Sequence, residues 1–233
     1  MKNVIILGGH GDGKVIVSAL QDQITFGKHL MIYGFLNDFE RKGEKIAGFP
    51  VLDKIENARR FLGQKDIYFI TALLKVKETH KRSQIIERLR IPHDRYYTLI
   101  HPQATVSKSA KIGPGTFVGP HVTIMPDSLI GRHCSLRASA NVGHDCVIGN
   151  YCYIGPNATL SGRVHLKDGV HIGPNASVLD RLELGSYSII GMGSVVLKSV
   201  SDFTIAFGCP ARNYTRLQRD EGDDLLICKE SPS

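Results

Sequence analysis

The stretch from Asn141 to Leu160, NVGHDCVIGNYCYIGPNATL, places a branched aliphatic residue at every sixth position. The same spacing continues without a slip from Val106 to Val196, which gives sixteen consecutive hexads. An α-helix repeats about every 3.6 residues and cannot hold a period of six on one face. A coil built from three short strands and three corners per eighteen-residue turn can, because each hexad then supplies one strand. The aliphatic positions are Val106, Ile112, Val118, Ile124, Ile130, Leu136, Val142, Ile148, Ile154, Leu160, Leu166, Ile172, Val178, Leu184, Ile190 and Val196.

Each aliphatic residue has characteristic neighbours. The position two residues before it is mostly small, and the residue after it is often glycine. We therefore expect the aliphatic side chain to point inward, the small residue to fit beside it, and glycine to serve the corner. Cys134, Cys146 and Cys152 occupy the small position, which predicts buried free thiols and a reducing, cytoplasmic compartment.

Residues 1–100 follow a different pattern, in which apolar runs alternate with amphipathic segments. This alternation predicts an α/β unit with a small doubly wound parallel sheet. The chain then divides into an N-terminal domain (1–100), the coil (101–214) and a polar tail (215–233) that we expect to be frayed. The expected strands are Val4–Gly9, Met31–Asp38 and Asp66–Leu73, and the expected helices are Lys14–Leu20, Glu56–Gly63 and Glu78–Arg90.

Charge and hydropathy narrow the classes of partner. The net charge of +7 lies mainly in residues 1–100, where 17 Lys and Arg face 11 Asp and Glu. This excess favours a phosphorylated ligand only mildly, since a solvated basic surface would look the same. The basic residues do not cluster with aromatic ones, so nucleic acid is not expected as a partner. The N-terminal apolar run is too short for a signal peptide, and no stretch has the length of a membrane helix.

The order of these parts resembles one group of hexapeptide-repeat acyltransferases, whose repeats form a left-handed parallel β-helix. The likeness rests on a Rossmann-like N-terminal unit, the joint LIHPQATV (Leu99–Val106), the hexads, and the GCPAR sequence (Gly208–Arg212). It covers about residues 2–214 and points to the enzymes that acetylate sialic acid or nucleotide-linked amino sugars, such as the bacillosamine-pathway N-acetyltransferases. The resemblance implies acetyl-CoA as co-substrate, a homotrimer and no metal.

His144 and Asp145 are the candidate catalytic pair. His144 falls two residues after the inward-facing Val142, so it belongs at a corner with its side chain outward. The corner one turn above carries Ser161 and Gly162, which predicts open space for a ligand. Acyl transfer to an amine needs a base, histidine titrates in a useful range, and a neighbouring carboxylate can orient its ring. The resemblance matches this pair to the family's His-Asp/Glu pair.

The other candidate residues come from the resemblance. Coenzyme A would lie along the coil, between subunits, against Tyr153, Gly162, Pro174 and Met192. Relatives often carry a second histidine where this chain has Tyr153. The nucleotide sugar would contact the glycine-rich loop through His10, Gly11 and Asp12, and the end of the second strand through Asn37 and Asp38. The loop follows a strand and opens a helix, which suits phosphate binding; relatives usually have histidine where Asp12 stands.

Other functions remain open at this level. The same pair could serve a hydroxyl, which would make the protein a sugar O-acetyltransferase acting on sialic acid. A non-catalytic trimeric scaffold that binds a sugar nucleotide is a third alternative. A β-helix carbonic anhydrase would hold zinc with three histidines. His121 and His133 share one hexad position, and His144 lies one step off it. We expect instead that the remaining histidines are scattered over the surface.

Overall fold

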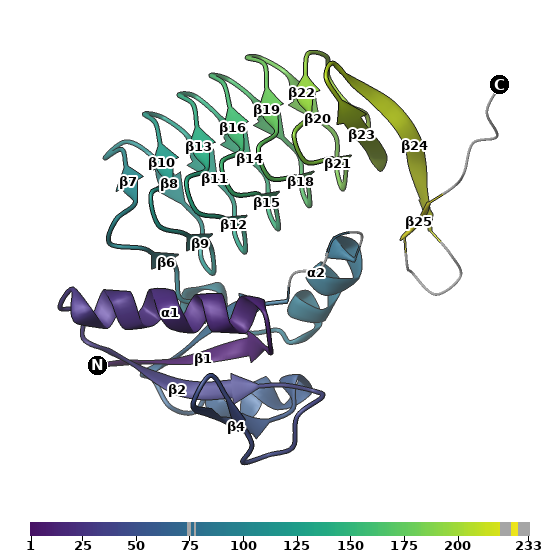
Figure 1. Ribbon diagram of the computed structural model, residues 1–233. Helices are drawn as coiled ribbons and strands as arrows, with labels where there is room; N and C mark the ends of the chain where they lie inside the picture. Colours follow the sequence, from purple (N-terminus) through teal and green to yellow (C-terminus); the bar gives the residue numbers. More distant parts are fainter. Residues whose placement is uncertain (74–75, 77, 220–224, 228–233) are drawn as a thin grey trace.

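The computed structural model describes residues 1–73, 76, 78–219 and 225–227, and it contains an α/β unit alongside a long coil of short strands (Figure 1). The α/β unit has a five-stranded sheet in the order β3-β4-β2-β1-β5. All neighbouring strands are parallel except the β3–β4 pair. The strands are β1 (Lys2–Gly8), β2 (Leu30–Leu36), β3 (Lys45–Ile46), β4 (Phe49–Asp53) and β5 (Ile67–Ala72).

The helices of this unit follow the sequence expectation with one difference in type. α1 (Asp12–Thr25) and α2 (Thr79–Arg88) are α-helices, as predicted, whereas η1 (Ile55–Phe61) is a 3₁₀-helix, as is the short η2 (His93–Arg95). The hairpin of β3 and β4 was not predicted, because β3 has only two residues and β4 contains a proline, which is typical of edge positions.

The coil confirms the hexad prediction. Every aliphatic position is the second residue of a two-residue strand. Each strand up to Ser177–Val178 pairs in parallel with the one eighteen residues further on, as Asn141–Val142 does with Thr159–Leu160. The strands are β6 (Leu99–Ile100), β7 (Thr105–Val106), β8 (Lys111–Ile112), β9 (Phe117–Val118), β10 (Thr123–Ile124), β11 (Leu129–Ile130), β12 (Ser135–Leu136), β13 (Asn141–Val142), β14 (Val147–Ile148), β15 (Tyr153–Ile154), β16 (Thr159–Leu160), β17 (His165–Leu166), β18 (His171–Ile172), β19 (Ser177–Val178), β20 (Glu183–Leu184), β21 (Ile189–Ile190) and β22 (Val195–Val196).

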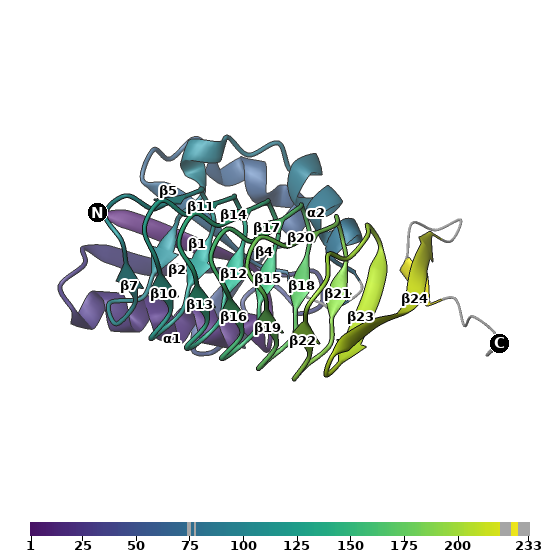
Figure 2. The same cartoon turned by 90° about the horizontal axis from the view of Figure 1, so that it is seen from above.

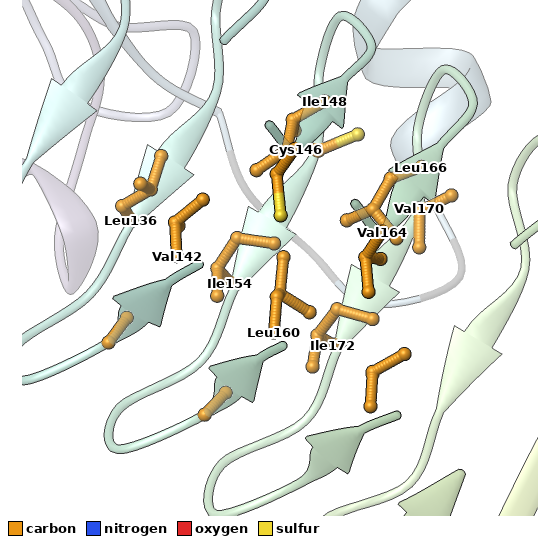
Figure 3. Close-up of a cluster of buried hydrophobic side chains, with 14 of the residues drawn as sticks. Leu136, Val142, Cys146, Ile148, Ile154, Leu160, Val164, Leu166, Val170 and Ile172 are labelled. Atoms are coloured by element: carbon orange, nitrogen blue, oxygen red, sulfur yellow. The ribbon is translucent and has the colours of Figure 1, made fainter. Parts of the chain in front are cut away.

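These strands form three parallel faces, named here after their first hexad strand. The β7 face runs β7-β10-β13-β16-β19-β22, the β8 face runs β8-β11-β14-β17-β20, and the β9 face runs β9-β12-β15-β18-β21 and continues into β23 (Thr204–Gly208). Aliphatic residues from all three faces meet inside, where Val142, Ile148 and Ile154 are at most 2% exposed (Figure 3). Because each turn buries its side chains against its neighbours, the turns stabilise one another.

The small positions also carry a ladder of side-chain hydrogen bonds. Thr116 Oγ1 donates to the carbonyl of Gly131 at 2.8 Å, and Ser128 Oγ to that of Gly143 at 2.7 Å. The buried thiols of Cys134, Cys146 and Cys152 donate in the same way to carbonyls fifteen residues ahead. These five buried polar groups therefore find partners at the corners of the next turn, which lets hydroxyls and thiols stand beside alanine in this row.

Glycine serves the corners through close approach rather than through its backbone freedom. A Cβ on Gly143 would lie 2.6 Å from the carbonyl carbon of Ser161, and one on Gly131 would lie 2.5 Å from the carbonyl oxygen of Gly149. The left-handed backbone lies two residues later and is mostly taken by other residues, for example Asp145 with φ 55°. The glycines thus let successive turns stack closely.

The α/β unit packs against the β9 face, so that α1 lies between its sheet and the coil (Figures 1 and 2). Phe117 of β9 joins the hydrophobic core of the α/β unit. Polar bonds add to this contact: Arg132 reaches Glu87 of α2 at 2.9 Å, and the Tyr151 hydroxyl also donates to Glu87. The first three turns of the coil are therefore tied to the unit that precedes them.

The segment after Tyr214 differs from the expectation of a frayed tail. Strand β24 (Ala211–Arg219) pairs antiparallel with β23 and with β25 (Leu225–Ile227). Leu217 is buried, and its N–H donates to the carbonyl of Phe203 at 2.6 Å. The prediction is therefore wrong for these strands, while residues 220–224 and 228–233 lie outside the described residues.

Candidate functional site

His144 and Asp145 form a hydrogen-bonded pair in the corner between β13 and β14. Nδ1 of His144 lies 2.7 Å from Oδ2 of Asp145, and about half of each side chain is exposed. An ionised carboxylate can only accept, so Nδ1 carries the hydrogen and Nε2 keeps its lone pair. Arg163 Nε lies 3.7 Å from the same carboxylate oxygen. The pair presents a proton acceptor held in one tautomer.

The corner above His144 is occupied by its own ring. A Cβ built on Gly162 would lie 2.6 Å from Nε2 and 2.8 Å from Cε1 of His144. The expectation of open space at this corner is wrong, because the imidazole folds over Gly162 and fills that space. Glycine at position 162 is what permits this ring position.

A second site lies at the carboxyl ends of the parallel strands of the α/β unit. A cleft of about 340 Å³ is lined by Gly8 and His10 after β1, by Asn37 and Asp38 after β2, and by Arg82 of α2, among others. Strands β2 and β5 flank β1 on opposite sides, and open α/β sheets bind ligands at such a switch point. Three of the five residues predicted to contact the nucleotide sugar, His10, Asn37 and Asp38, line this cleft.

The polar residues of this cleft also hold its shape. The buried Asn37 donates from Nδ2 to the carbonyl of Gly8 at 3.0 Å, and its Oδ1 accepts from the backbone of Phe39 and Glu40. Asp38 Oδ1 accepts from the N–H of Ile55 at the start of η1. These bonds fix the glycine-rich loop against the end of β2. Any ligand contact by Asn37 or Asp38 would come in addition to this structural role.

His10 is paired across the same cleft. Its Nε2 lies 2.8 Å from Oε1 of Glu40, and the hydrogen bond from His10 is the main cause that lowers the pKa of that carboxyl group. Sequence reasoning missed Glu40 and Arg82, which lie outside the glycine-rich loop and gain their place only through the fold. Gly11 precedes α1 with φ 77°, a left-handed value that favours glycine.

A larger pocket of about 540 Å³ lies between the α/β unit and the β9 face. It is lined by Asp12 of α1, Thr79 of α2, and Tyr153, Pro174 and Met192 of the coil, among others. Asp12 was predicted to bind the sugar nucleotide, and the three coil residues were predicted to bind coenzyme A. The structure thus brings members of both predicted sets into one pocket, whereas Gly162 lies apart from it, at the His144 corner. Asp12 Oδ1 accepts from Arg137 at 2.8 Å.

Two histidines expected at the surface are covered instead, His133 fully and His171 in part. His133 is 4% exposed and packs against Tyr96 and Tyr151, and burial, followed by the Arg132 charge, lowers its pKa to about 3. His171 stacks on Tyr153 with ring centroids 4.4 Å apart, and burial lowers its pKa to about 4. Both rings are therefore neutral at physiological pH. Their burial follows from the α/β unit, which covers the β9 side of the coil.

His121 and His165 are exposed, as expected. Within residues 1–73, 76, 78–219 and 225–227, no group of three or more His, Cys, Asp or Glu side chains converges in a way that could hold a metal. In the same part of the chain, no helix combines the length and apolarity needed to cross a bilayer.

Comparison with known proteins gives matches to both parts of the chain. The family described as bacterial transferase hexapeptide (six repeats) matches residues 127–162. The curated UDP-N-acetylbacillosamine N-acetyltransferase of Bacillus subtilis (strain 168) is 38% identical over 118 residues, which is 51% of this chain. The match spans about half the length of that relative, 51%.

Two solved structures match over nearly the whole chain. One is a variant of perosamine N-acetyltransferase from Caulobacter crescentus in complex with CoA and GDP-perosamine, with a TM-score of 0.78 and 27% identity over 91% of this chain and 97% of that one. The other is the acetyltransferase domain of PglB from Neisseria gonorrhoeae FA1090 in complex with acetyl coenzyme A, with a TM-score of 0.76 and 28% identity over 91% and 98%.

Proposed function

We propose that this chain, a hexapeptide-repeat protein of the sugar N-acetyltransferase group, transfers an acetyl group from acetyl-CoA to the amino group of a nucleotide-linked amino-deoxy sugar, with UDP as the expected nucleotide. The observation that carries this proposal is the His144–Asp145 pair, which stands on an exposed corner of the coil with one ring nitrogen free of the carboxylate. The product would serve the synthesis of a surface glycan.

His144 would act as the general base. The amine nitrogen attacks the thioester carbonyl carbon and forms the C–N bond, Nε2 takes the proton that the nitrogen must lose, and the C–S bond breaks to release CoA as a thiolate. The protonated ring can then return its proton to the sulfur. Asp145 would hold the ring in the required tautomer and stabilise its charged form.

We infer that residues 1–100 form a Rossmann-like domain that binds the nucleotide sugar. The cleft at the ends of β1, β2 and β5 supports this assignment, since ligands of open α/β sheets lie at that edge. His10 and Gly11 before α1 would face the diphosphate, where the helix N-terminus favours negative charge. Asp12, which lines the larger pocket, would contact the nucleotide sugar there. Asn37 and Asp38 would lie near the base.

We propose a homotrimer in which two chains complete each active site. The His144 corner joins the β7 and β8 faces, whereas the large pocket opens on the β9 face, so a neighbour is needed to bring them together. Apolar residues support this arrangement: Met125, Leu179 and Leu197 lie along the His144 corner and are 45–48% exposed. Acetyl-CoA would then lie between Gly162 of one chain and Tyr153, Pro174 and Met192 of another. In each chain these residues would stand on a left-handed coil formed by residues 101–214. The unpaired cysteines support a cytoplasmic location.

The decisive experiment measures CoA release from acetyl-CoA with a panel of UDP-, GDP- and dTDP-linked amino sugars and with free sialic acid. We expect turnover with an amino-sugar nucleotide and a loss of about 10²–10⁴-fold in kcat for His144→Ala. Acetylation of sialic acid alone would favour the O-acetyltransferase alternative. Binding of a sugar nucleotide without any turnover would favour the non-catalytic scaffold.

A further inference from the structure

The pocket between the α/β unit and the β9 face has mostly apolar walls. Apolar side chains of the coil, Pro174, Ile189, Ile190 and Met192, cover one side. Among the lining residues that the structure describes, few side chains can form hydrogen bonds: Asp12, Thr79, Tyr153 and His171. In a pocket of this kind, a small number of polar groups decides which ligand is accepted and how it is oriented.

Among the described residues, the ring of His171 lacks a hydrogen-bonding partner, whereas several other histidines of the chain have one. His10, His101, His144 and His165 each lie within 4 Å of a carboxylate. The ring of His171 makes no hydrogen bond or ion pair with any residue in the described part of the chain, and it is held by stacking on Tyr153 at 4.4 Å and an interplanar angle of 4°.

The burial that lowers the pKa of His171 to about 4 keeps the ring neutral at physiological pH. A neutral imidazole offers one N–H donor and one acceptor. The partner it suits is an uncharged group that can both accept and donate, such as a sugar hydroxyl. A phosphate would be a poorer match, because the apolar walls and the Asp12 carboxylate both disfavour a further negative charge there.

The pocket and the cleft of the α/β unit are lined in part by the same two segments of the chain. The loop before α1 contributes His10 to the cleft, and Asp12, the first residue of α1, lines the pocket. Helix α2 contributes Arg82 to the cleft and Thr79 to the pocket. A nucleotide whose base and diphosphate lie in the cleft would therefore extend its sugar past the start of α1 into the pocket.

We propose that His171, placed by its stack on Tyr153, is a specificity-determining residue that hydrogen-bonds a hydroxyl of the acceptor sugar. The proposal rests on the proposed function and adds to it a residue that selects the sugar. It also assigns Tyr153 a second role, because its ring fixes the position of the imidazole.

The test compares His171→Phe with His165→Phe. His165 is the matched control, since it also begins a two-residue strand before a buried aliphatic residue, but on the β8 face and 50% exposed. We expect His171→Phe to raise KM for the amino-sugar nucleotide about tenfold, the effect of losing one hydrogen bond, with KM for acetyl-CoA unchanged. His171→Gln, which keeps a donor and an acceptor, should recover part of the loss. Equal KM values for the amino-sugar nucleotide in both phenylalanine variants, with turnover intact, would overturn the proposal for His171 and leave the proposed function standing.

A binding measurement separates the sugar from the nucleotide and from the acyl donor. By calorimetry, His171→Phe should bind the nucleotide without sugar as tightly as the wild type, and the complete nucleotide sugar more weakly. Equal weakening for both ligands would place His171 at the nucleotide and overturn the proposal. A selective rise in KM for acetyl-CoA would do the same by placing it at the donor. A wild-type protein without any turnover would overturn the proposed function as well.

Discussion

Replacing Gly162 with alanine should displace the His144 imidazole without unfolding the coil. The new Cβ would lie 2.6 Å from Nε2, and ordinary contact begins at 3.4 Å, so the ring must move by roughly 0.8 Å. The ring can move because its side chain is 53% exposed. A misplacement of about 1 Å can lower a rate by about 10²-fold. We therefore expect kcat to fall about 10- to 100-fold, while the free energy of unfolding changes by about 0.5 kcal/mol or less.

The assay is steady-state acetyl transfer combined with a urea melt, in wild-type and His144→Ala backgrounds. If Gly162→Ala acts through the ring, it should have no further effect once the ring is gone, because coupled residues are not additive. Gly131→Ala is the contrasting control, since its Cβ would lie 2.5 Å from a backbone oxygen that cannot swing away; it should destabilise the coil by about 1–3 kcal/mol. An equal loss of kcat from Gly162→Ala in both backgrounds would refute the reasoning.

Three further outcomes are expected. Asp145→Asn should lower kcat less than His144→Ala does, because the imidazole remains but is held less well; steady-state kinetics with a thermal melt checks this, and a larger loss would contradict it. Light scattering should give the mass of a trimer at micromolar concentration, and a stable monomer would argue against the shared active site. The neutral His133 ring stabilises the fold fully above its unfolded pKa of about 6.5, and this contribution is lost as the pH falls toward its folded pKa of about 3. Between pH 7.5 and 4.5, His133→Phe should therefore lose roughly 2–3 kcal/mol less stability than the wild type in urea melts, and equal losses would show that His133 does not carry this pH dependence.

The coil could be predicted from the sequence because its signal is local and repeated. A period of six has one structural solution, and the register of Val142 also fixes His144 at a corner. The glycines that follow the aliphatic residues can also be assigned to corners from the sequence. Why glycine is required there cannot, because the contact between Gly143 and Ser161 exists only once the turns are stacked.

The faces covered by the α/β unit could not be predicted in this way. His165 and His171 have the same local pattern, a histidine before a buried aliphatic residue, yet one is exposed and the other lines a pocket. The difference arises from the distant helices that approach only the β9 face. The same long-range packing brings Asp12 beside Tyr153, and the roles assigned to both remain predictions.

The eighteen-residue turn spaces equivalent side chains at constant intervals along the outside of the coil. Tyr153, His171 and Ile189 occupy the same place on consecutive turns, so they mark off intervals of about 4.8 Å along the axis. An inserted or deleted segment preserves the inward aliphatic row only if it comprises whole turns, since any other length rotates every later side chain out of place. Duplication of one complete turn within the gene would therefore lengthen the pocket wall by a single interval. The length of ligand that the pocket accepts can thus evolve only in steps of that size.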